Sequence, residues 1–387
     1  MAYSDFVRER LRSVLRAAGL GTAASAVRSL LNGLVASKRS SRGPYVQGVT
    51  ATSAVIAWMS KEPGAGVVKY GKKAPELGWE EADRRIDRRH AVAIAGLEPG
   101  STYHYRVEGV GESWLKGGFR TAPAGEGSSF SFAVVGDSGS GGKGQRVVAG
   151  LLGRLEPDLV LHTGDVVYPA GEERHYDRRF FTPYRELIKE VPVFPVLGNH
   201  DVRNGNGAAF LDNFHPPLGS LGSTKRYYSF DWGDAHFVAL DSELYYGDKG
   251  SSAERQKAFL ERDMAATDKR WKVAFLHRSP YGTSKHGSDN KVRYDLEPLF
   301  ARHKVDLVFA GHDHVYERTV PIRGVTYVVS GGGGRRLYPA GGGRLTACSR
   351  SAHHAVIVRV DGGRLSLEAT EPDGTVFDRF ASIYSGE

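Results

Sequence analysis

Five short motifs in the sequence carry side chains that could bind metal ions, and each lies at the end of an apolar stretch. They are GD at 136–137, GDVVY at 164–168, GNHD at 198–201, His277, and GHDH at 311–314. Carboxylate, phenolate and imidazole groups together suit iron, zinc and manganese. The single cysteine, Cys348, excludes an iron–sulfur cluster and a cysteine-rich zinc site. The motifs therefore indicate a metal centre of oxygen and nitrogen donors.

The number of candidate ligands exceeds what one tetrahedral ion needs, so two metal ions are implied. The candidates are Asp137, Asp165, Tyr168, Asn199, His277, His312 and His314. A carboxylate can bridge two cations about 3.5–4 Å apart, the separation that two-metal phosphoryl chemistry uses. Any one of these motifs alone is more often structural than functional. Because they recur in series at strand ends, a metal site is favoured over coincidence.

The elements that must position these ligands alternate between buried strands and amphipathic helices. Strands are predicted at 131–137, 157–165, 191–201, 271–277 and 305–314, with helices at 144–155, 175–190, 251–266 and 294–303 between them. This alternation is typical of a layered α/β domain. In such sheets, ligands bind outside the carboxyl ends of the strands, which is where the motifs lie.

Further strands are predicted toward the end of the chain. A strand pair is expected at 227–242, another strand at 324–334, and three final strands that alternate with period two at 355–363, 364–374 and 375–382. The run GGGG at 331–334 has no Lys and Ser/Thr after it, so it predicts a flexible turn rather than a P-loop. Tyr316, Glu317 and Arg318 are predicted to orient the histidines of GHDH.

Residues 43–123 predict a separate small β-sandwich. Several short runs there alternate with period two, and LEPGSTY at 97–103 resembles the tyrosine corner of fibronectin type III domains. The segment 124–129 reads as a linker. Three parts are therefore expected: a basic helical tail and linker at 1–42, the sandwich at 43–123, and a catalytic domain at 128–385.

The formal net charge of +8 is unevenly distributed along the 387 residues. Residues 1–42 hold a net +6, and the rest of the chain holds only +2. Apolar residues at helical spacing interleave with arginines in residues 1–36, so this segment could form a solvated tail, a peripheral membrane helix or an export signal. The nearly neutral body argues against nucleic acid as a partner. The sequence does not determine the oligomeric state.

The ordered motifs resemble the calcineurin-like metallophosphoesterase superfamily and, more narrowly, the purple acid phosphatases. The residues that carry the resemblance are GDSG at 136–139, GDVVY at 164–168, GNHD at 198–201, His277, and GHDHVYER at 311–318. The usual first motif of the superfamily is Asp-x-His, whereas this chain has Gly139 in place of that histidine, and Tyr168 can supply the missing ligand. The resemblance spans roughly residues 44–385. It implies a four-layer α/β sandwich preceded by an all-β, fibronectin-like domain.

The resemblance also implies a role for each motif residue. The first ion would be held by Asp137, Asp165, Tyr168 and His314, and the second by Asp165 as a bridge, Asn199, His277 and His312. Ferric iron is implied at the tyrosine, with Fe(II), Zn(II) or Mn(II) as the second ion. His200 and His286 are the candidate catalytic residues that contact the phosphate or protonate the leaving group. The family is frequently secreted, although the segment 17–27 is a poor apolar core for a signal peptide.

The function expected from these residues is hydrolysis of phosphate monoesters by attack of a metal-activated hydroxide. Two alternatives stay open. One is a phosphodiesterase acting on nucleotide or lipid headgroup esters. The other is a non-catalytic surface protein that uses the sandwich for binding and keeps a degenerate phosphatase scaffold.

Overall fold

The computed structural model describes residues 42–108, 115–125, 127–220, 222–247 and 251–384. The predicted basic tail at 1–41, with its suggested membrane contact, lies outside the described residues. Within the described part, none of the helices is both long enough and apolar enough to cross a membrane.

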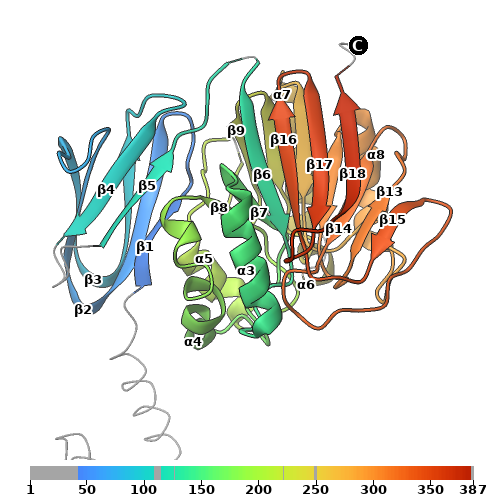
Figure 1. The fold of residues 1–387 in the computed structure, drawn as a ribbon, viewed down its shortest axis with the longest axis horizontal. Helices are drawn as coiled ribbons and strands as arrows, with labels where there is room; N and C mark the ends of the chain where they lie inside the picture. Colours follow the sequence, from blue (N-terminus) through green and yellow to red (C-terminus); the bar gives the residue numbers. More distant parts are fainter. Residues whose placement is uncertain (1–41, 109–114, 126, 221, 248–250, 385–387) are drawn as a thin grey trace, which may run out of the picture.

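Two mixed sheets form the larger part of the molecule (Figure 1). The six-stranded sheet runs in the order β18-β17-β16-β6-β7-β8, and the seven-stranded sheet in the order β15-β13-β14-β12-β11-β10-β9. The strands of the first are β6 Ser129–Val135, β7 Leu159–His162, β8 Val193–Pro195, β16 Ala355–Asp361, β17 Arg364–Thr370 and β18 Val376–Ile383. Those of the second are β9 Tyr228–Trp232, β10 Ala235–Ala239, β11 Trp271–Phe275, β12 Leu307–Ala310, β13 Tyr316–Thr319, β14 Thr326–Ser330 and β15 Thr346–Arg350.

Alternation along the strands divides the apolar side chains between three layers of packing. Phe132 of β6 points between the sheets, where its ring meets that of Phe237 at 5.1 Å, edge to face. Its neighbour Ala133 faces the other way and packs in the cluster that includes Val148 of helix α3 (Lys143–Leu155). On the seven-stranded sheet, Val238 packs with the helices α7 (Ser251–Ala266) and α8 (Asn290–Arg302). The four-layer α/β prediction is therefore confirmed.

The amino-terminal part is all β, as predicted. Its strands are β1 Arg42–Gln47, β2 Ser53–Gly71, β3 Trp79–Ala95, β4 Thr102–Glu108 and β5 Leu115–Arg120. Strand β2 pairs with β1 through its first half and with β4 through its second half. The Tyr103 hydroxyl accepts a hydrogen bond from the backbone N–H of Glu98 at 2.9 Å, the contact expected of a tyrosine corner.

Arg42 joins the amino-terminal strands to the larger part. Its guanidinium is almost fully buried and bridges Glu173 at 2.6 Å, Asp177, and the side-chain oxygen of Asn213 at 2.7 Å. The same guanidinium lies 4.6 Å from the ring centre of Phe181. Because a buried guanidinium must be paired and hydrogen-bonded, these contacts fix β1 against this face of the larger part.

The structure differs from the prediction in one helix and contains strands that were not predicted. The single helix expected at 175–190 is broken into α4 (Glu173–Tyr176), a π-helix (Asp177–Phe181) and a 3-10 helix (Leu187–Lys189). Pro183 lies between the last two and has no N–H for a helical hydrogen bond. The charged stretch at 80–90, for which no element was predicted, lies in strand β3, whose outer face is solvated. Strands β13 and β15 were not expected, since neither is long enough to show a clear period.

A buried histidine gives the fold a testable pH dependence. His236 of β10 binds Asp231 through Nδ1 at 2.7 Å and Asp263 of α7 through Nε2 at 2.8 Å. Burial opposes the charge of His236, but the two carboxylates raise its pKa from 6.5 to about 9. The stabilisation is therefore full below pH 6.5 and is lost as the pH rises to about 9.

We expect the wild type to be more stable than His236→Gln. The difference between their free energies of unfolding should be largest at pH 6 and smallest above pH 9. The pH-dependent part of the difference should be on the order of 2 kcal/mol, because Asp231 is half exposed and its contribution is screened. Urea unfolding of both proteins across this range measures it. A difference that does not change with pH would contradict the prediction.

Candidate metal centre

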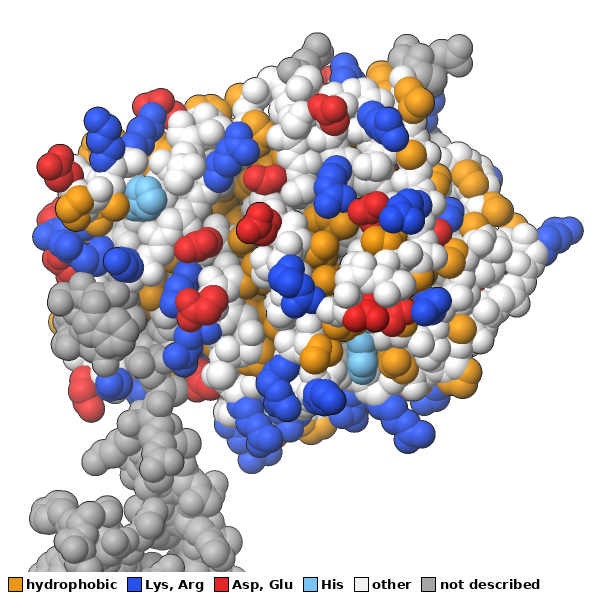
Figure 2. Space-filling view, viewed as in Figure 1, with side chains coloured by type: hydrophobic (Ala, Val, Ile, Leu, Met, Phe, Trp, Pro, Cys, Tyr) orange, Lys and Arg blue, Asp and Glu red, His pale blue; other side chains and the backbone are white. Residues whose placement is uncertain are grey.

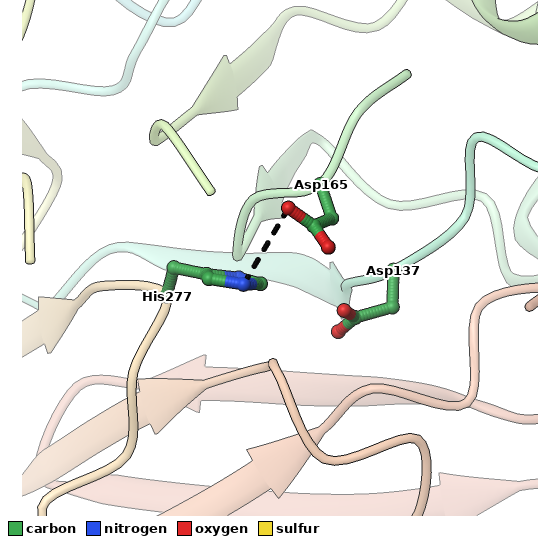
Figure 3. A group of neighbouring side chains, drawn as sticks. All are labelled: Asp137, Asp165 and His277. Carbon is green, nitrogen blue, oxygen red and sulfur yellow. Dashed lines mark ion pairs between the residues drawn. The ribbon is translucent and has the colours of Figure 1, made fainter. Parts of the chain in front are cut away.

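The predicted ligands meet at the carboxyl ends of the parallel strands of both sheets. Ligand atoms of Asp137, Asp165 and His277 lie within 4.8 Å of one another, and all three side chains are buried. Figure 3 shows them pointing into one shared space, with Asp137 following β6, Asp165 following β7 and His277 following β11. The Nε2 atom of His277 is 3.5 Å from Oδ1 of Asp165.

One set of donors gathers around Asp137. The Tyr168 hydroxyl lies 3.1 Å from Oδ1 of Asp137 and 3.1 Å from Nε2 of His314. The His314 Nε2 is 3.5 Å from the same Asp137 oxygen. A phenol, a carboxylate and an imidazole therefore present donor atoms to one point.

A second set gathers around His277. Its Nε2 atom lies 3.1 Å from Oδ1 of Asn199 and 3.2 Å from Nδ1 of His312. The same nitrogen lies 3.5 Å from Asp165, which also reaches toward His200, so Asp165 lies beside this set. All seven predicted ligands are thus brought together. Six of them fall into the two groups that the sequence analysis expected, and Asp165, the predicted bridge, lies beside the second group.

Backbone carbonyls orient the imidazole rings. His277 donates its Nδ1 hydrogen to the Thr163 carbonyl at 2.8 Å, and His314 donates its own to the Arg336 carbonyl at 2.7 Å. Because a carbonyl only accepts, the proton of each ring is held at Nδ1 and the Nε2 lone pair faces the other donors. Both rings are therefore prepared as metal ligands before any ion binds.

The charge of the site is unbalanced without a cation. Asp137 and Asp165 are 0% and 2% exposed, and within the described ranges neither forms an ion pair with Lys or Arg. Burial raises the pKa of Asp137 to about 6 and holds that of Tyr168 well above its usual value. A buried cation would favour the charged forms of both groups.

The spacing of the donor atoms also fits metal ions. Metal–ligand bonds of about 2.1 Å place neighbouring ligand atoms roughly 3.0–3.4 Å apart in octahedral or tetrahedral sites. The contacts among Tyr168, His314, His277, Asn199 and His312 measure 3.1–3.2 Å, inside this range. The residues present therefore fit a two-ion centre.

Strained backbone delivers some of these ligands. Asp137, Asp165 and His312 have positive φ angles of 56°, 53° and 70°, which are uncommon for residues other than glycine. The glycine before Asn199 allows the strand ends to approach, because a methyl group on Gly198 would overlap the backbone nitrogen and a carboxylate oxygen of Asp165. The GD and GN motifs thus combine a ligand with the glycine that makes room for it.

Asp201 is the main positioning residue that the sequence analysis did not identify. Its buried carboxylate accepts hydrogen bonds from the backbone N–H groups of Gly198 at 3.0 Å, Val166 at 3.1 Å and Val167 at 3.1 Å. It therefore ties the loop that carries Asn199 to the loop that carries Asp165. The only signal in the sequence was its place as the last residue of GNHD.

The two candidate catalytic histidines lie on different sides of the centre. His200 donates its Nδ1 hydrogen to the Pro169 carbonyl at 2.6 Å, and its Nε2 lies 3.9 Å from Asp165. His286 is exposed and stacks on the ring of His312, with ring centres 4.2 Å apart. His200 therefore lies beside Asp165, and His286 lies beside His312.

The predicted role of the residues after GHDH is wrong. Tyr316 and Arg318 bind Asp378 of β18 at 2.5 and 2.7 Å, and Glu317 accepts from Thr283 at 2.7 Å. None of these bonds reaches His312 or His314. Because the chain enters β13 at Tyr316, these side chains leave the site: Tyr316 and Arg318 join the seven-stranded sheet to β18 of the six-stranded sheet, and Glu317 holds the loop at Thr283.

Known proteins share both parts of this chain. Residues 130–316 match the calcineurin-like phosphoesterase family, and residues 44–121 match the purple acid phosphatase N-terminal domain. Purple acid phosphatase 21 of Arabidopsis thaliana is 31% identical over 307 residues, covering 70% of this chain and 66% of the relative. Purple acid phosphatase 23 of the same plant is 30% identical over 334 residues, covering 72% and 70%. The chain thus spans about two thirds of the length of these two relatives.

The fold is similar to that of a solved plant enzyme. The structure of purple acid phosphatase PPD1 from yellow lupin (Lupinus luteus) seeds superposes with a TM-score of 0.75 at 21% sequence identity. The match covers 87% of this chain and 73% of the lupin protein. It therefore includes amino-terminal strands as well as the two central sheets.

Proposed function

The chain belongs to the purple acid phosphatase family of dinuclear metallophosphoesterases, which hydrolyse phosphoric esters, and we propose that its substrates are phosphate monoesters. The observation that carries the proposal is the convergence of seven buried or half-buried donors in two adjoining groups. Membership of the family accounts for the hydrolysis of phosphoric esters, whereas the preference for monoesters over diesters is our proposal.

We assign the ligands as follows. Asp137, Asp165, Tyr168 and His314 would hold the first ion, and Asp165, Asn199, His277 and His312 the second. The hard phenolate of Tyr168 supports Fe(III) at the first site, and the imidazole and amide donors of the second suit Fe(II), Zn(II) or Mn(II).

The bound ions would neutralise the phosphate charge and activate water for in-line attack. The chain's own residues control the proton. Since His200 keeps its Nδ1 hydrogen on the Pro169 carbonyl, a second proton taken up at acid pH would sit on Nε2, the nitrogen that faces the centre. Burial lowers the pKa of His200, so this proton is readily given to the departing alkoxide. His286 would be a second donor on the His312 side.

Comparing an aryl monophosphate with a bis-aryl phosphate tests the monoester proposal. We expect kcat/KM to be larger for the monoester by at least about 10-fold, because only a monoester presents enough unesterified oxygens to engage both ions and His200. A large preference for the diester would contradict the proposal. Metal analysis that finds less than one ion per chain, together with no hydrolysis, would instead support a degenerate scaffold.

The visible spectrum tests the assignment of Tyr168. Protein loaded with ferric iron should show a phenolate-to-iron charge-transfer band, and Tyr168→Phe should lose it, because phenylalanine has no donor oxygen. The control is Tyr228→Phe, which removes the hydroxyl of a buried tyrosine that donates to the Pro195 carbonyl at 2.8 Å. A band that persists in Tyr168→Phe, or is lacking in iron-loaded wild type, would contradict the assignment.

A further inference from the structure

Two glycine-rich stretches differ in how they are packed. The run at 331–334 is not the flexible turn that its composition predicts, because all four glycines are buried and a methyl group on Gly331 would overlap the backbone oxygen of Asp313. The pair Gly117 and Gly118 is only half-buried. It belongs to β5, which lies at the edge of a sheet.

The outer edge of β5 has no neighbouring strand. In the described part of the sheet β5 pairs only with β4. The Thr121 N–H donates to the Ser101 carbonyl at 3.0 Å, and this bond sets the alternation of the antiparallel ladder. The residues whose backbone N–H and carbonyl point away from β4 are therefore Lys116, Gly118 and Arg120. Within the described ranges, no hydrogen bond engages these backbone groups.

A groove of about 820 Å³ follows this edge. Residues 116–120 all line it, with Pro75 and Leu77 on the sandwich and Glu186 and Glu190 on the larger part. An edge strand beside an open groove is a template for pairing with an extended segment of another chain.

Close packing fixes the far wall of the groove before any partner binds. The Tyr105 hydroxyl donates to the Lys189 carbonyl at 2.8 Å, which holds the 3-10 helix Leu187–Lys189 beside β5. A methyl group on Gly117 would overlap both of these oxygens, so the glycine allows the close approach. Because the groove is preformed, little ordering opposes binding in it.

Two cations lie on the outer face of the edge. Lys116 and Arg120 are exposed, and Gly118 lies between them on the same face because side chains alternate along a strand. Among the described residues Lys116 forms no ion pair, and Arg120 is 3.6 Å from Asp158. Figure 2 shows several Lys and Arg side chains over the amino-terminal strands, which lie on the left of Figure 1. This face of the edge therefore suits acidic side chains.

Charge disfavours the two occupants that this protein could itself supply. Residues 1–42 hold a net +6, so the tail has the wrong charge for Lys116 and Arg120. A second copy paired edge to edge would place the same two cations opposite one another, and like charges directly opposite destabilise a strand pair.

We propose that the free edge of β5 binds an extended acidic segment of a partner protein by strand addition. Backbone bonds to the edge would hold the segment, and its side chains would supply the specificity. The segment that fits has two acidic residues four positions apart, one opposite Lys116 and one opposite Arg120. An aromatic residue midway between them would cover Gly118, where His104 also lines the groove. The metal centre takes no part, so this inference and the proposed function can fail separately.

Two synthetic peptides test the proposal on the full chain. Acetyl-STETYTETSG-amide has the acidic and aromatic residues at the required spacing, and acetyl-STKTYTKTSG-amide has lysine in place of glutamate. We expect calorimetry to show that the glutamate peptide binds and that the lysine peptide binds at least about 10-fold more weakly, because opposite-charge pairs become like-charge pairs. No binding of the glutamate peptide, or equal binding of both, would overturn the proposal.

Reversing the charge of the edge should exchange the two peptides. In Lys116→Glu combined with Arg120→Glu, the lysine peptide should become the tighter ligand by about 10-fold, a gain that loss of folding cannot produce. Arg84→Glu is the matched control, since Arg84 is exposed on β3 and lies outside the groove. It should leave the preference unchanged, and a reversal there as well would refute a specific site.

Amide hydrogen exchange locates the bound peptide. The glutamate peptide should slow exchange at Lys116, Gly118 and Arg120. It should leave Gly117 and Phe119 unchanged, because their N–H groups already bond to β4. Binding without protection of the three edge amides would overturn the proposal. Protection of these amides in the free protein would also overturn it, because the edge would then already be covered by the basic tail or by a second copy.

Discussion

Asp165→Asn is expected to reduce the metal content of the purified protein to less than one ion per chain and to lower phosphatase activity by more than about 100-fold. Removing residues that merely orient ligands typically costs 10–100-fold in affinity or activity, and Asp165 is proposed to touch both ions. The amide would remove the charge that attracts the cations and would leave one oxygen in place of two.

The fold should survive this substitution. The side-chain oxygen of the introduced amide would still accept the His200 backbone N–H, which lies 2.8 Å from Oδ1 of Asp165 in the wild type. Moreover, the buried charge of Asp165 is a cost to the metal-free protein, so the free energy of unfolding of the metal-free variant should equal or exceed that of the metal-free wild type.

Metal analysis, kinetics with an aryl monophosphate and urea unfolding of the metal-free proteins measure these effects. Asp373→Asn is the control, because Asp373 is exposed and accepts the Thr375 N–H of its own turn at 2.9 Å. Two bound ions in Asp165→Asn would refute the bridging assignment. A less stable metal-free variant would point to a structural role instead.

Gly198→Ala should be as damaging, for a steric reason. The new methyl group would overlap the Asp165 backbone nitrogen and carboxylate oxygen, so the two ligand-bearing loops would have to separate. Backbone atoms cannot turn aside as a flexible side chain can. We expect a loss of about 1–3 kcal/mol in the free energy of unfolding and a loss of metal affinity of at least about 10-fold.

The control is the same substitution in a helix. Gly153 of α3 is exposed, and a methyl group there would have nothing within 4 Å. Gly153→Ala should therefore stabilise the protein by about 0.5–1 kcal/mol and leave metal binding unchanged. Urea unfolding and metal titration of both variants test the pair. If Gly198→Ala binds metal as the wild type does, the close approach of the loops is not needed for the site.

Local patterns in the sequence predicted the layers and the seven side chains that the structure brings together. Apolar strands such as 131–137 and 305–314 are recognisable because both faces are buried, and the candidate ligand at each strand end is a polar residue after an uninterrupted apolar run. The helix at 175–190 was predicted wrongly because the prediction followed the helical spacing of the apolar residues and ignored the helix-breaking effect of Pro183. The strand β13 was missed because four residues are too few to show a period.

The chemistry of the donors was determined by the sequence itself, since the types of the side chains in the five motifs are independent of how the chain folds. Their division into two groups and the carboxylate of Asp201 that ties two loops together were decided only by the tertiary structure. The physical reason is that the contacts that assemble the site join residues from 31 to 175 positions apart. The periodicity of a segment contains no information about which distant segments it contacts. In the same way, the sequence of a glycine run does not show whether the run is flexible or packed against a strand.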